Sequence, residues 1–274
     1  MAEAIDYKHI GSRPVRPDGV DKVTGRAEFG GDVSLPGMII GKILRSPHAH
    51  ARIKSIDITD ALAIPGVHAV ITGEDFPGGG ISGEIDGEGG GSISDQAKNV
   101  IARDKVLYHG HALAAVAAIS DRAADRALDA IKVEYEVLSP VLDILEAIDP
   151  DSVLVNENNY TKLPEKPDRP SNIANVGNLI RGDIQEGFGR ADVVIEREYV
   201  CPMTHQGYIE PHSCLASVDE EGKGTVWCST QGHFEFRNQT ASILKKNIAD
   251  LKFVAKEIGG GFGGKTVGYL EPLA

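Results

Sequence analysis

The sequence has little cysteine, no surplus of basic residues and no long apolar run, and each absence excludes a class of protein. Its three cysteines, Cys201, Cys214 and Cys228, are widely spaced and form no C-x-x-C pair. This chain alone therefore builds neither a disulfide framework nor a cysteine-ligated iron–sulfur cluster, and we expect all three to be small buried side chains. A net charge of −12 argues against nucleic-acid binding, because contact with a phosphate backbone needs a surplus of Lys and Arg.

The amino terminus has no basic region followed by an apolar core, and no segment approaches about 18 consecutive apolar residues. The sequence therefore predicts a cytoplasmic protein without a membrane anchor. Its 274 residues are enough for about two domains.

Alternating and β-branched segments separated by short helical patterns predict a mixed α and β fold. Strands are expected over residues 38–46, 51–58, 67–73, 112–120 and 132–138, with helices over 59–66 and 121–131. A second group of expected elements follows in the chain, with strands over 191–200, 214–219, 224–230 and 251–258 and a helix over 233–247. An extended arm is expected over 11–37, a glycine-rich loop over 76–94 and a surface linker over 149–178.

Residues 258–266, IGGGFGGKT, fit the pattern G-x-x-x-x-G-K-[ST] of nucleotide-binding loops, with Gly259, Gly264, Lys265 and Thr266 in the required places. A run of glycines lets the backbone approach a ligand closely and presents several N–H groups to an anion, whichever anion it is. A nucleotide loop opens a βαβ sheet, but eight residues follow Thr266 here. The residues alone leave a nucleotide loop, another anion site and a structural turn as alternatives.

Several segments together resemble the molybdopterin-binding subunit of the xanthine dehydrogenase and aldehyde oxidase family of molybdenum hydroxylases. RPDGVDKVTGRAEFGGDV, IPGVHAVITGEDFP and YHGHALAAVAAISDRAADRALDAIKVEYEVLSPVLD are similar to the family's hammerhead α/β domain. HQGYIEPHSCLA, STQG and GGGFGGK are similar to the opening of its molybdenum domain and its two cofactor-contacting motifs. Gln231 and Phe262 lie 31 positions apart, as the matching residues do in the family.

The resemblance implies an α+β (mixed α/β) fold, in which a hammerhead α/β domain precedes the first part of a molybdenum-cofactor-binding α+β domain. The expected divisions are an N-terminal arm over 1–19, the hammerhead domain over 20–145, a linker over 146–178 and a partial molybdopterin-binding domain over 179–274.

By the same resemblance, the side-chain amide of Gln231 is expected to hydrogen-bond an oxygen ligand of the molybdenum. Gly260, Gly261, Phe262 and Gly263 are expected to lie against the cofactor, with Phe262 shaping the pocket. The alternatives are that Gln231 caps the helix that follows it and that the Phe262 ring is buried in the core.

Lys265 and Thr266 are expected near the substrate pocket. Purine-oxidising members have a glutamate after the lysine, and Thr266 stands in its place, which leaves aldehydes and electron-poor aromatic or N-heteroaromatic substrates open. The catalytic glutamate base of the family is expected beyond residue 274, and no residue of this chain is expected to ligate the metal directly. Glu210 is expected to have either a structural or a chemical role.

The resemblance thus implies part of a molybdenum-dependent oxidoreductase that hydroxylates carbon with water-derived oxygen and is active only with the remaining C-terminal part or chain. Its cofactor would be molybdopterin-bound molybdenum, with or without a cytosine nucleotide, and [2Fe-2S] clusters and FAD would lie on partner subunits of a hetero-oligomer. Two alternatives stay open. One is a P-loop-like nucleotide-binding protein using Gly259–Thr266, and the other is a non-catalytic structural or assembly subunit with the same fold.

Four histidines form two pairs at a spacing of two residues, His48 with His50 and His109 with His111. This spacing places each pair on one face of a strand, but no third metal ligand is evident nearby. His205 and His212 flank Glu210, and packing or hydrogen bonding is the expected role of both.

Overall fold

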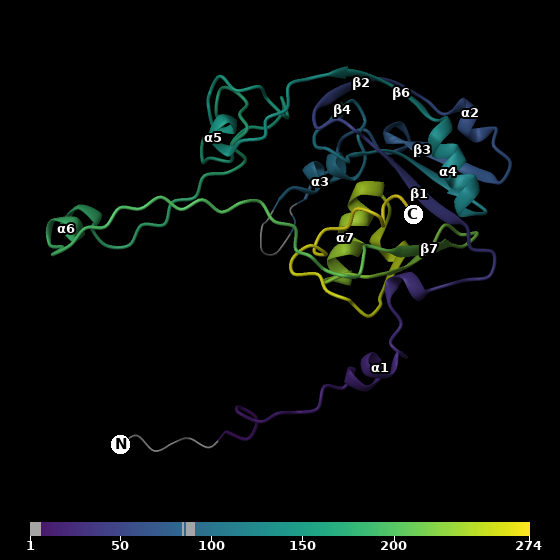
Figure 1. Ribbon diagram of the computed structural model, residues 1–274, viewed down its shortest axis with the longest axis horizontal. Coiled ribbons are helices and arrows are strands. Elements are labelled where there is room, and N and C mark those ends of the chain that lie inside the picture. The colour runs from purple at the N-terminus through teal and green to yellow at the C-terminus, as the bar shows by residue number, and fades with distance from the viewer. Residues whose placement is uncertain (1–6, 84, 86–90) are drawn as a thin grey trace.

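The computed structural model describes residues 7–83, 85 and 91–274. Figure 1 shows two packed groups of helices and strands, with the amino-terminal segment projecting from one side. A long excursion that carries α5 (Ile144–Ala147) and α6 (Ile184–Gly189) projects from another side. The predicted mixed fold is confirmed.

The first unit contains two three-stranded sheets. One has the order β1-β5-β3, and the other has the order β4-β2-β6, with every pairing antiparallel. The strands are β1 (Ile40–Arg45), β2 (Ala51–Asp57), β3 (Val67–Thr72), β4 (Lys105–Val106), β5 (Ala112–Ala118) and β6 (Lys132–Val137).

The core of the first unit forms where small side chains let a helix approach a sheet closely. Helix α4 (Asp121–Ala130) begins after Ser120, whose hydroxyl accepts the Ala123 N–H, and buries Ala123, Ala124 and Ala127. These alanines pack on the central strand β5, and the short helix α2 (Thr59–Leu62) contributes the buried Ala61. Burial of this alanine and valine surface holds the unit together.

The second unit is a three-stranded sheet with the order β7-β8-β9, covered by helix α7 (His233–Leu244). Strands β7 (Cys214–Val218) and β8 (Gly224–Cys228) form an antiparallel hairpin, whereas β8 and β9 (Leu251–Ala255) are parallel. Parallel neighbours need a crossover connection, and α7 supplies it. Its Phe236 belongs to one apolar cluster with Val226 and Phe253 of the sheet.

The two units share a core and a buried polar contact. Helix α3 (Ile93–Val100) packs against α7, and Ile243 joins the apolar cluster around Ile93 and Val100. The buried Gln96 amide donates to Gln239 Oε1 at 2.7 Å and to the Gly268 carbonyl at 2.8 Å. Helices of four to six residues also occur at α1 (Gly19–Thr24), α5 (Ile144–Ala147) and α6 (Ile184–Gly189).

Several sequence predictions need correction. Residues 191–200 form no strand, although their pattern predicts one. The expected extended arm contains helix α1, and α3 begins inside the expected loop over 76–94, of which residues 84 and 86–90 lie outside the described residues. Residues 267–274 form turns and not the start of a helix. Among the described residues, no helix is both long and apolar enough to span a bilayer.

Candidate functional site

The candidate site lies at one edge of the β7-β8-β9 sheet. Because β8 and β9 are parallel, their carboxyl ends leave the sheet at the same edge, with Cys228 opposite Ala255. Strand β8 continues into residues 229–231, and β9 continues into the glycine run of residues 259–264. Strand β7 is antiparallel to β8, so the segment that precedes it, which contains Glu210, starts at this edge too. The sheet thus brings together three motifs that are far apart in sequence.

The side chain of Gln231 holds the glycine loop through hydrogen bonds to two backbone N–H groups. Its Oε1 atom accepts the Gly263 N–H at 3.0 Å and the Lys265 N–H at 3.1 Å, and its backbone N–H donates to the Lys265 carbonyl at 2.9 Å. Two backbone donors at one end of the amide identify that end as the oxygen. The NH2 group makes no hydrogen bond within the described chain, so it is the end that can donate to a ligand.

The loop needs glycine at Gly261 and Gly263 for different reasons. A Cβ atom on Gly261 would lie 2.5 Å from Gln231 Oε1, closer than atoms can approach. Gly263 has a φ of +84°, in the left-handed region that favours glycine. Gly260 lies against Tyr208. Within the described chain, no protein acceptor takes the N–H groups of residues 260–262, so three successive N–H donors remain for a ligand.

Phe262 projects from the loop with its residue 73% exposed, so the alternative of a ring buried in the core is wrong. Its φ is +48°, a left-handed conformation that side-chain-bearing residues rarely adopt. Strain of this kind concentrates at functional sites and persists where surrounding contacts hold the backbone. Here the bonds from Gln231 to the next residues of the loop supply that constraint.

Lys265 is fully buried, and its ammonium forms an ion pair with Glu210. Its Nζ atom donates to Glu210 Oε2 at 2.7 Å and to the Ser229 hydroxyl at 2.8 Å. The same carboxylate accepts the Ser229 hydroxyl at 2.8 Å and the Gly259 N–H at 2.7 Å, and the Gly30 N–H lies 3.4 Å from its other oxygen. Glu210 thus joins the loop, the residue that follows strand β8 and the amino-terminal segment.

The pKa of Glu210 is set by opposing effects. Burial acts to raise it, but the Lys265 ammonium, the Gly259 N–H and the Ser229 hydroxyl outweigh burial and lower the pKa below its ordinary value. Glu210 is therefore a carboxylate held in place by donors. Of the two roles expected for Glu210, this arrangement supports the structural one.

The same ion pair disfavours the nucleotide alternative. In a phosphate-binding loop the lysine ammonium reaches the phosphates and a helix begins directly after the loop. Here the Lys265 ammonium is buried on Glu210, and residues 267–274 form turns. Thr266 donates from its hydroxyl to the Gly263 carbonyl at 3.0 Å, which closes the loop on itself.

Tyr208 is a site residue that sequence reasoning missed. Its ring lies 5.0 Å from the Lys265 ammonium, and its hydroxyl is 2.9 Å from His212 Nε2. Burial, followed by the nearby Lys265 charge, lowers the His212 pKa. His205 Nδ1 accepts the Gly207 N–H at 3.0 Å. Residues 209 and 210 form a bend outside any strand, so period-two alternation in the sequence could not have identified Tyr208.

One member of each histidine pair of the first unit is held by hydrogen bonds of its ring. His111 accepts the Leu107 N–H at Nδ1 and is 2.8 Å from the Lys98 carbonyl at Nε2, and burial lowers its pKa to about 4. His50 Nδ1 is 2.7 Å from the Ser139 carbonyl. Among the described residues, no group of three or more His, Cys, Asp or Glu could hold a metal ion.

Of the three cysteines expected to be buried, Cys228 is buried, Cys214 is half-buried and Cys201 is not buried. Cys214 and Cys228 face each other across β7 and β8, and burial raises the pKa of both thiols, that of Cys228 to about 12. Neither thiol is a nucleophile at neutral pH. Cys201 is exposed, so the expectation of burial is wrong there.

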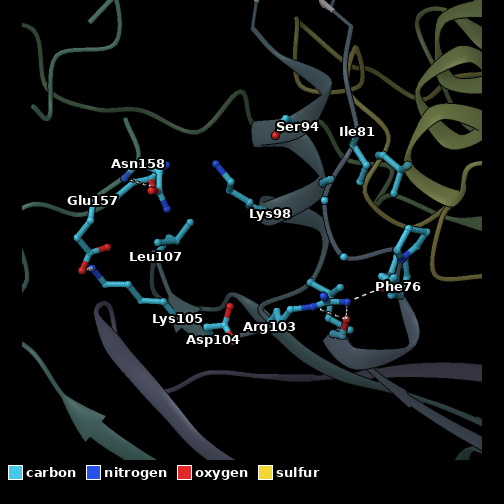
Figure 2. A pocket seen from close by; sticks show the side chains of 18 of the residues that line it. Phe76, Ile81, Ser94, Lys98, Arg103, Asp104, Lys105, Leu107, Glu157 and Asn158 are labelled. Carbon is cyan, nitrogen blue, oxygen red and sulfur yellow. Dashed lines mark hydrogen bonds and ion pairs between the residues drawn. The ribbon is translucent and has the colours of Figure 1, made fainter. Parts of the chain in front are cut away.

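A separate cavity of about 570 Å³ lies between α3, the segment around Phe76 and the excursion near Glu157 (Figure 2). Its cationic side chains are already engaged. Arg103 donates to the Gly73 and Phe76 carbonyls, and Lys105 pairs with Glu157 at 2.9 Å. The cavity therefore offers neither of these two cations to an anionic ligand.

Two family models match the chain, one after the other. The model of the aldehyde oxidase and xanthine dehydrogenase a/b hammerhead domain matches residues 24–139. The model of the molybdopterin cofactor-binding domain matches residues 165–274. The second match includes the glycine loop, Gln231 and the segment that carries Glu210.

Known proteins are similar along nearly the whole chain. A probable xanthine dehydrogenase subunit of Bacillus subtilis (strain 168) is 35% identical over 95% of the chain, which spans 32% of that relative. A nicotinate dehydrogenase large molybdopterin subunit of Eubacterium barkeri is 34% identical over 95% of the chain, which spans 56% of it. The crystal structure of quinoline 2-oxidoreductase from Pseudomonas putida 86 superimposes with a TM-score of 0.74 at 26% identity, covering 93% of the chain and 31% of that structure.

Proposed function

Because the chain belongs to the aldehyde oxidase and xanthine dehydrogenase family, we propose that it forms one wall of the molybdenum-cofactor site of a molybdenum hydroxylase. The observation that carries the proposal is the contact between Gln231 and Gly263 of the glycine loop, which are 32 residues apart in sequence and which the sheet brings to one edge. The proposed divisions are an arm over 1–19, the hammerhead domain over 20–145, a linker over 146–178 and part of the cofactor domain over 179–274.

The donors at this edge suit an oxygen-bearing, electron-rich group. The Gln231 NH2 and the N–H groups of residues 260–262 lack protein acceptors in the described chain, and none of them can titrate at neutral pH. Neutral donors fixed by the scaffold suit oxygen ligands of a metal or the polar rim of a pterin. The exposed Phe262 adds an apolar surface beside them.

The cofactor, when bound, would supply the redox chemistry of hydroxylation with water-derived oxygen. The residues of this chain would orient and enclose it. Gln231 and the loop would hold hydrogen bonds to it, and Phe262 would exclude water from one side of the reacting carbon. Lys265 and Thr266 stay predicted pocket residues, and the burial of Lys265 supports a contribution through the position of the loop.

An aldehyde or an electron-poor aromatic or N-heteroaromatic compound is the proposed substrate, since Thr266 replaces the glutamate expected for purines. The general base, iron–sulfur clusters and FAD would come from other polypeptide segments or subunits. Support comes from the relatives, several of which are named as subunits and are longer than this chain. A cytoplasmic location stays a prediction.

The test is to purify the native complex that contains this chain and to compare Gln231→Ala with Glu221→Ala, an exposed change in the β7–β8 turn at the opposite end of the same sheet. We expect molybdenum and pterin in the wild-type complex and a fall of about 10- to 100-fold in hydroxylation for Gln231→Ala alone. A complex without molybdenum or pterin would refute the proposal. Binding of Mg-ATP that is lost in Lys265→Ala would favour the nucleotide alternative, and a metal-free complex unaffected by Gln231→Ala would favour the structural subunit.

A further inference from the structure

The excursion between the two units exposes apolar side chains to an unusual degree. Every residue from 174 to 207 is exposed. Large apolar residues among them include Leu179 at 98%, Tyr199 at 84% and Met203 at 100% exposure. Large apolar side chains exposed in this number mark a site of interaction with another polypeptide or segment.

Residues 179–204 of the excursion are also without hydrogen bonds or ion pairs to the rest of the described chain. Figure 1 shows the segment with α6 extending away from both packed units. Within the described chain, the Glu196 carbonyl accepts from the neighbouring Arg197 side chain, and the other backbone N–H and C=O groups of residues 192–200 have no protein partner. They are open, as on the edge of a sheet.

The sequence of this segment is that of a strand with one buried face. Val193, Ile195 and Tyr199 alternate with Asp192, Glu196 and Glu198. An extended chain therefore has a mainly apolar face, which also carries Arg197, and a mainly acidic face, which also carries Val194 and Val200. Val193, Ile195 and Tyr199 are all more than 70% exposed, so the face that the pattern would bury is open. The segment has the sequence of a strand and pairs with no sheet of the described chain.

We propose that residues 191–201 add as a β-strand to the polypeptide segment that supplies the remainder of the molybdopterin-binding domain. This inference rests on the proposed function, since that segment is the part of the relatives that this chain does not span. The molybdopterin-binding match begins at residue 165 and includes residues 191–201, which therefore belong to the cofactor-binding region of the chain. Backbone pairing gives such an addition its affinity, and pockets for the apolar face give it specificity.

A second copy of this chain is a poorer occupant. Symmetric antiparallel pairing of two copies would place the acidic faces of both strands on the same side, so that Asp192, Glu196 and Glu198 of each copy gather on one surface. Like charges across paired strands destabilise a sheet. A partner with basic or neutral residues along its edge strand avoids this repulsion.

Hydrogen exchange of the native complex and of the isolated chain tests the pairing directly. We expect the amides of residues 192–200 to exchange about 100-fold more slowly or better in the complex, while residues 219–222 of the exposed β7–β8 turn stay unchanged. Unprotected amides in an intact complex would overturn the inference. A short thiol-directed cross-linker on the exposed Cys201 then identifies the neighbour by peptide mass spectrometry.

Adjacent valines provide a matched pair of variants. Val193→Asp introduces a charge on the apolar face and is expected to reduce complex formation by at least about 10-fold, whereas Val194→Asp on the acidic face should change it by less than about threefold. Equal effects of the two changes would overturn the strand assignment. Cross-links from Cys201 to the rest of the molybdopterin-binding domain support the proposal, and cross-links to a second copy or to β7 of the same chain overturn it.

The outcomes separate this inference from the proposed function. A protected strand in a complex without molybdenum would leave the docking intact and refute the function. Molybdenum-dependent hydroxylation in a complex whose residues 192–200 exchange freely would support the proposed function and refute the strand pairing.

Discussion

Replacing Lys265 with methionine is expected to destabilise the protein by roughly 3 kcal/mol, because the change leaves the Glu210 carboxylate buried without its counter-charge. Breaking a buried ion pair typically costs about 3–5 kcal/mol. The structure favours the lower end of that range, since Glu210 keeps the Ser229 hydroxyl and the Gly259 N–H as donors and its side chain is 12% exposed. Methionine fills a similar volume, so a cavity contributes little.

The double variant Lys265→Met with Glu210→Gln is the control for charge. It removes both charges, so no uncompensated carboxylate remains, and we expect it to recover at least about half of the lost stability. Urea unfolding of the wild type, both single variants and the double variant at pH 7 measures the coupling between the two residues. A loss below about 1 kcal/mol in Lys265→Met, or a double variant no more stable than it, would refute the reasoning.

The stability difference between the wild type and Lys265→Met depends on pH because the pKa of Glu210 is lowered in the folded protein. In the acid range the unfolded chain binds the proton of Glu210 more readily than the folded protein does, so this contribution to stability is present above the ordinary pKa of 4.5 and is lost as the pH falls through the folded-state pKa. The free energy of unfolding of the wild type should therefore exceed that of Lys265→Met by the full amount at pH 7. The excess should become progressively smaller below about pH 4.5. A difference that stays constant down to pH 3 would contradict this assignment.

Two further predictions concern a close contact and a buried acid. Gly261→Ala, which would place Cβ 2.5 Å from Gln231 Oε1, should destabilise the protein by about 1–3 kcal/mol, whereas Gly31→Ala meets nothing within 4 Å and should change stability by less than about 0.5 kcal/mol. Thermal unfolding compares the two, and equal melting temperatures would exclude the close contact. Burial raises the pKa of Glu271 to about 7, so the folded protein holds this proton more tightly and stability falls as the pH rises from about 4.5 to 7. Glu271→Gln should then be more stable than the wild type by up to about 3 kcal/mol above pH 7, with the gain vanishing near pH 4.5, and a pH-independent gain in urea unfolding would argue against it.

Sequence patterns predicted the elements whose partners lie within this chain. The apolar run at residues 112–120 forms the central strand β5, and the helical pattern that follows forms α4, because each buries its apolar face against the other. The short helices α1 and α6 were not predicted. Six residues give less than two turns, too few for a helical period to stand out.

The segment over 191–200 shows where a pattern is insufficient. Alternation indicates that one face is buried against a sheet, but it does not say which polypeptide supplies that sheet. The segment is exposed, and it pairs with no strand among the described residues. Tertiary context therefore decides whether the same residues form a strand.

The site was predicted in part through the family resemblance and in part not at all. Gln231 and the glycine loop meet as the resemblance implies, because parallel β8 and β9 deliver both to one edge. The ion pair of Lys265 with Glu210 spans 55 residues and depends on the register of β7 with β8. With 40 acidic residues in the chain, the sequence contains no signal that selects Glu210 as the partner.

The buried ion pair also explains how one glycine pattern serves two kinds of ligand. A loop whose lysine is free adds a mobile positive charge to its backbone N–H groups, which suits a polyphosphate. In this chain the Lys265 charge is neutralised within the protein by Glu210, and Gln231 takes the N–H groups of Gly263 and Lys265. What remains for a ligand is a short row of neutral donors beside an exposed ring. Such a surface discriminates by the position of hydrogen bonds more than by net charge, as expected for oxygen atoms on a metal or a pterin.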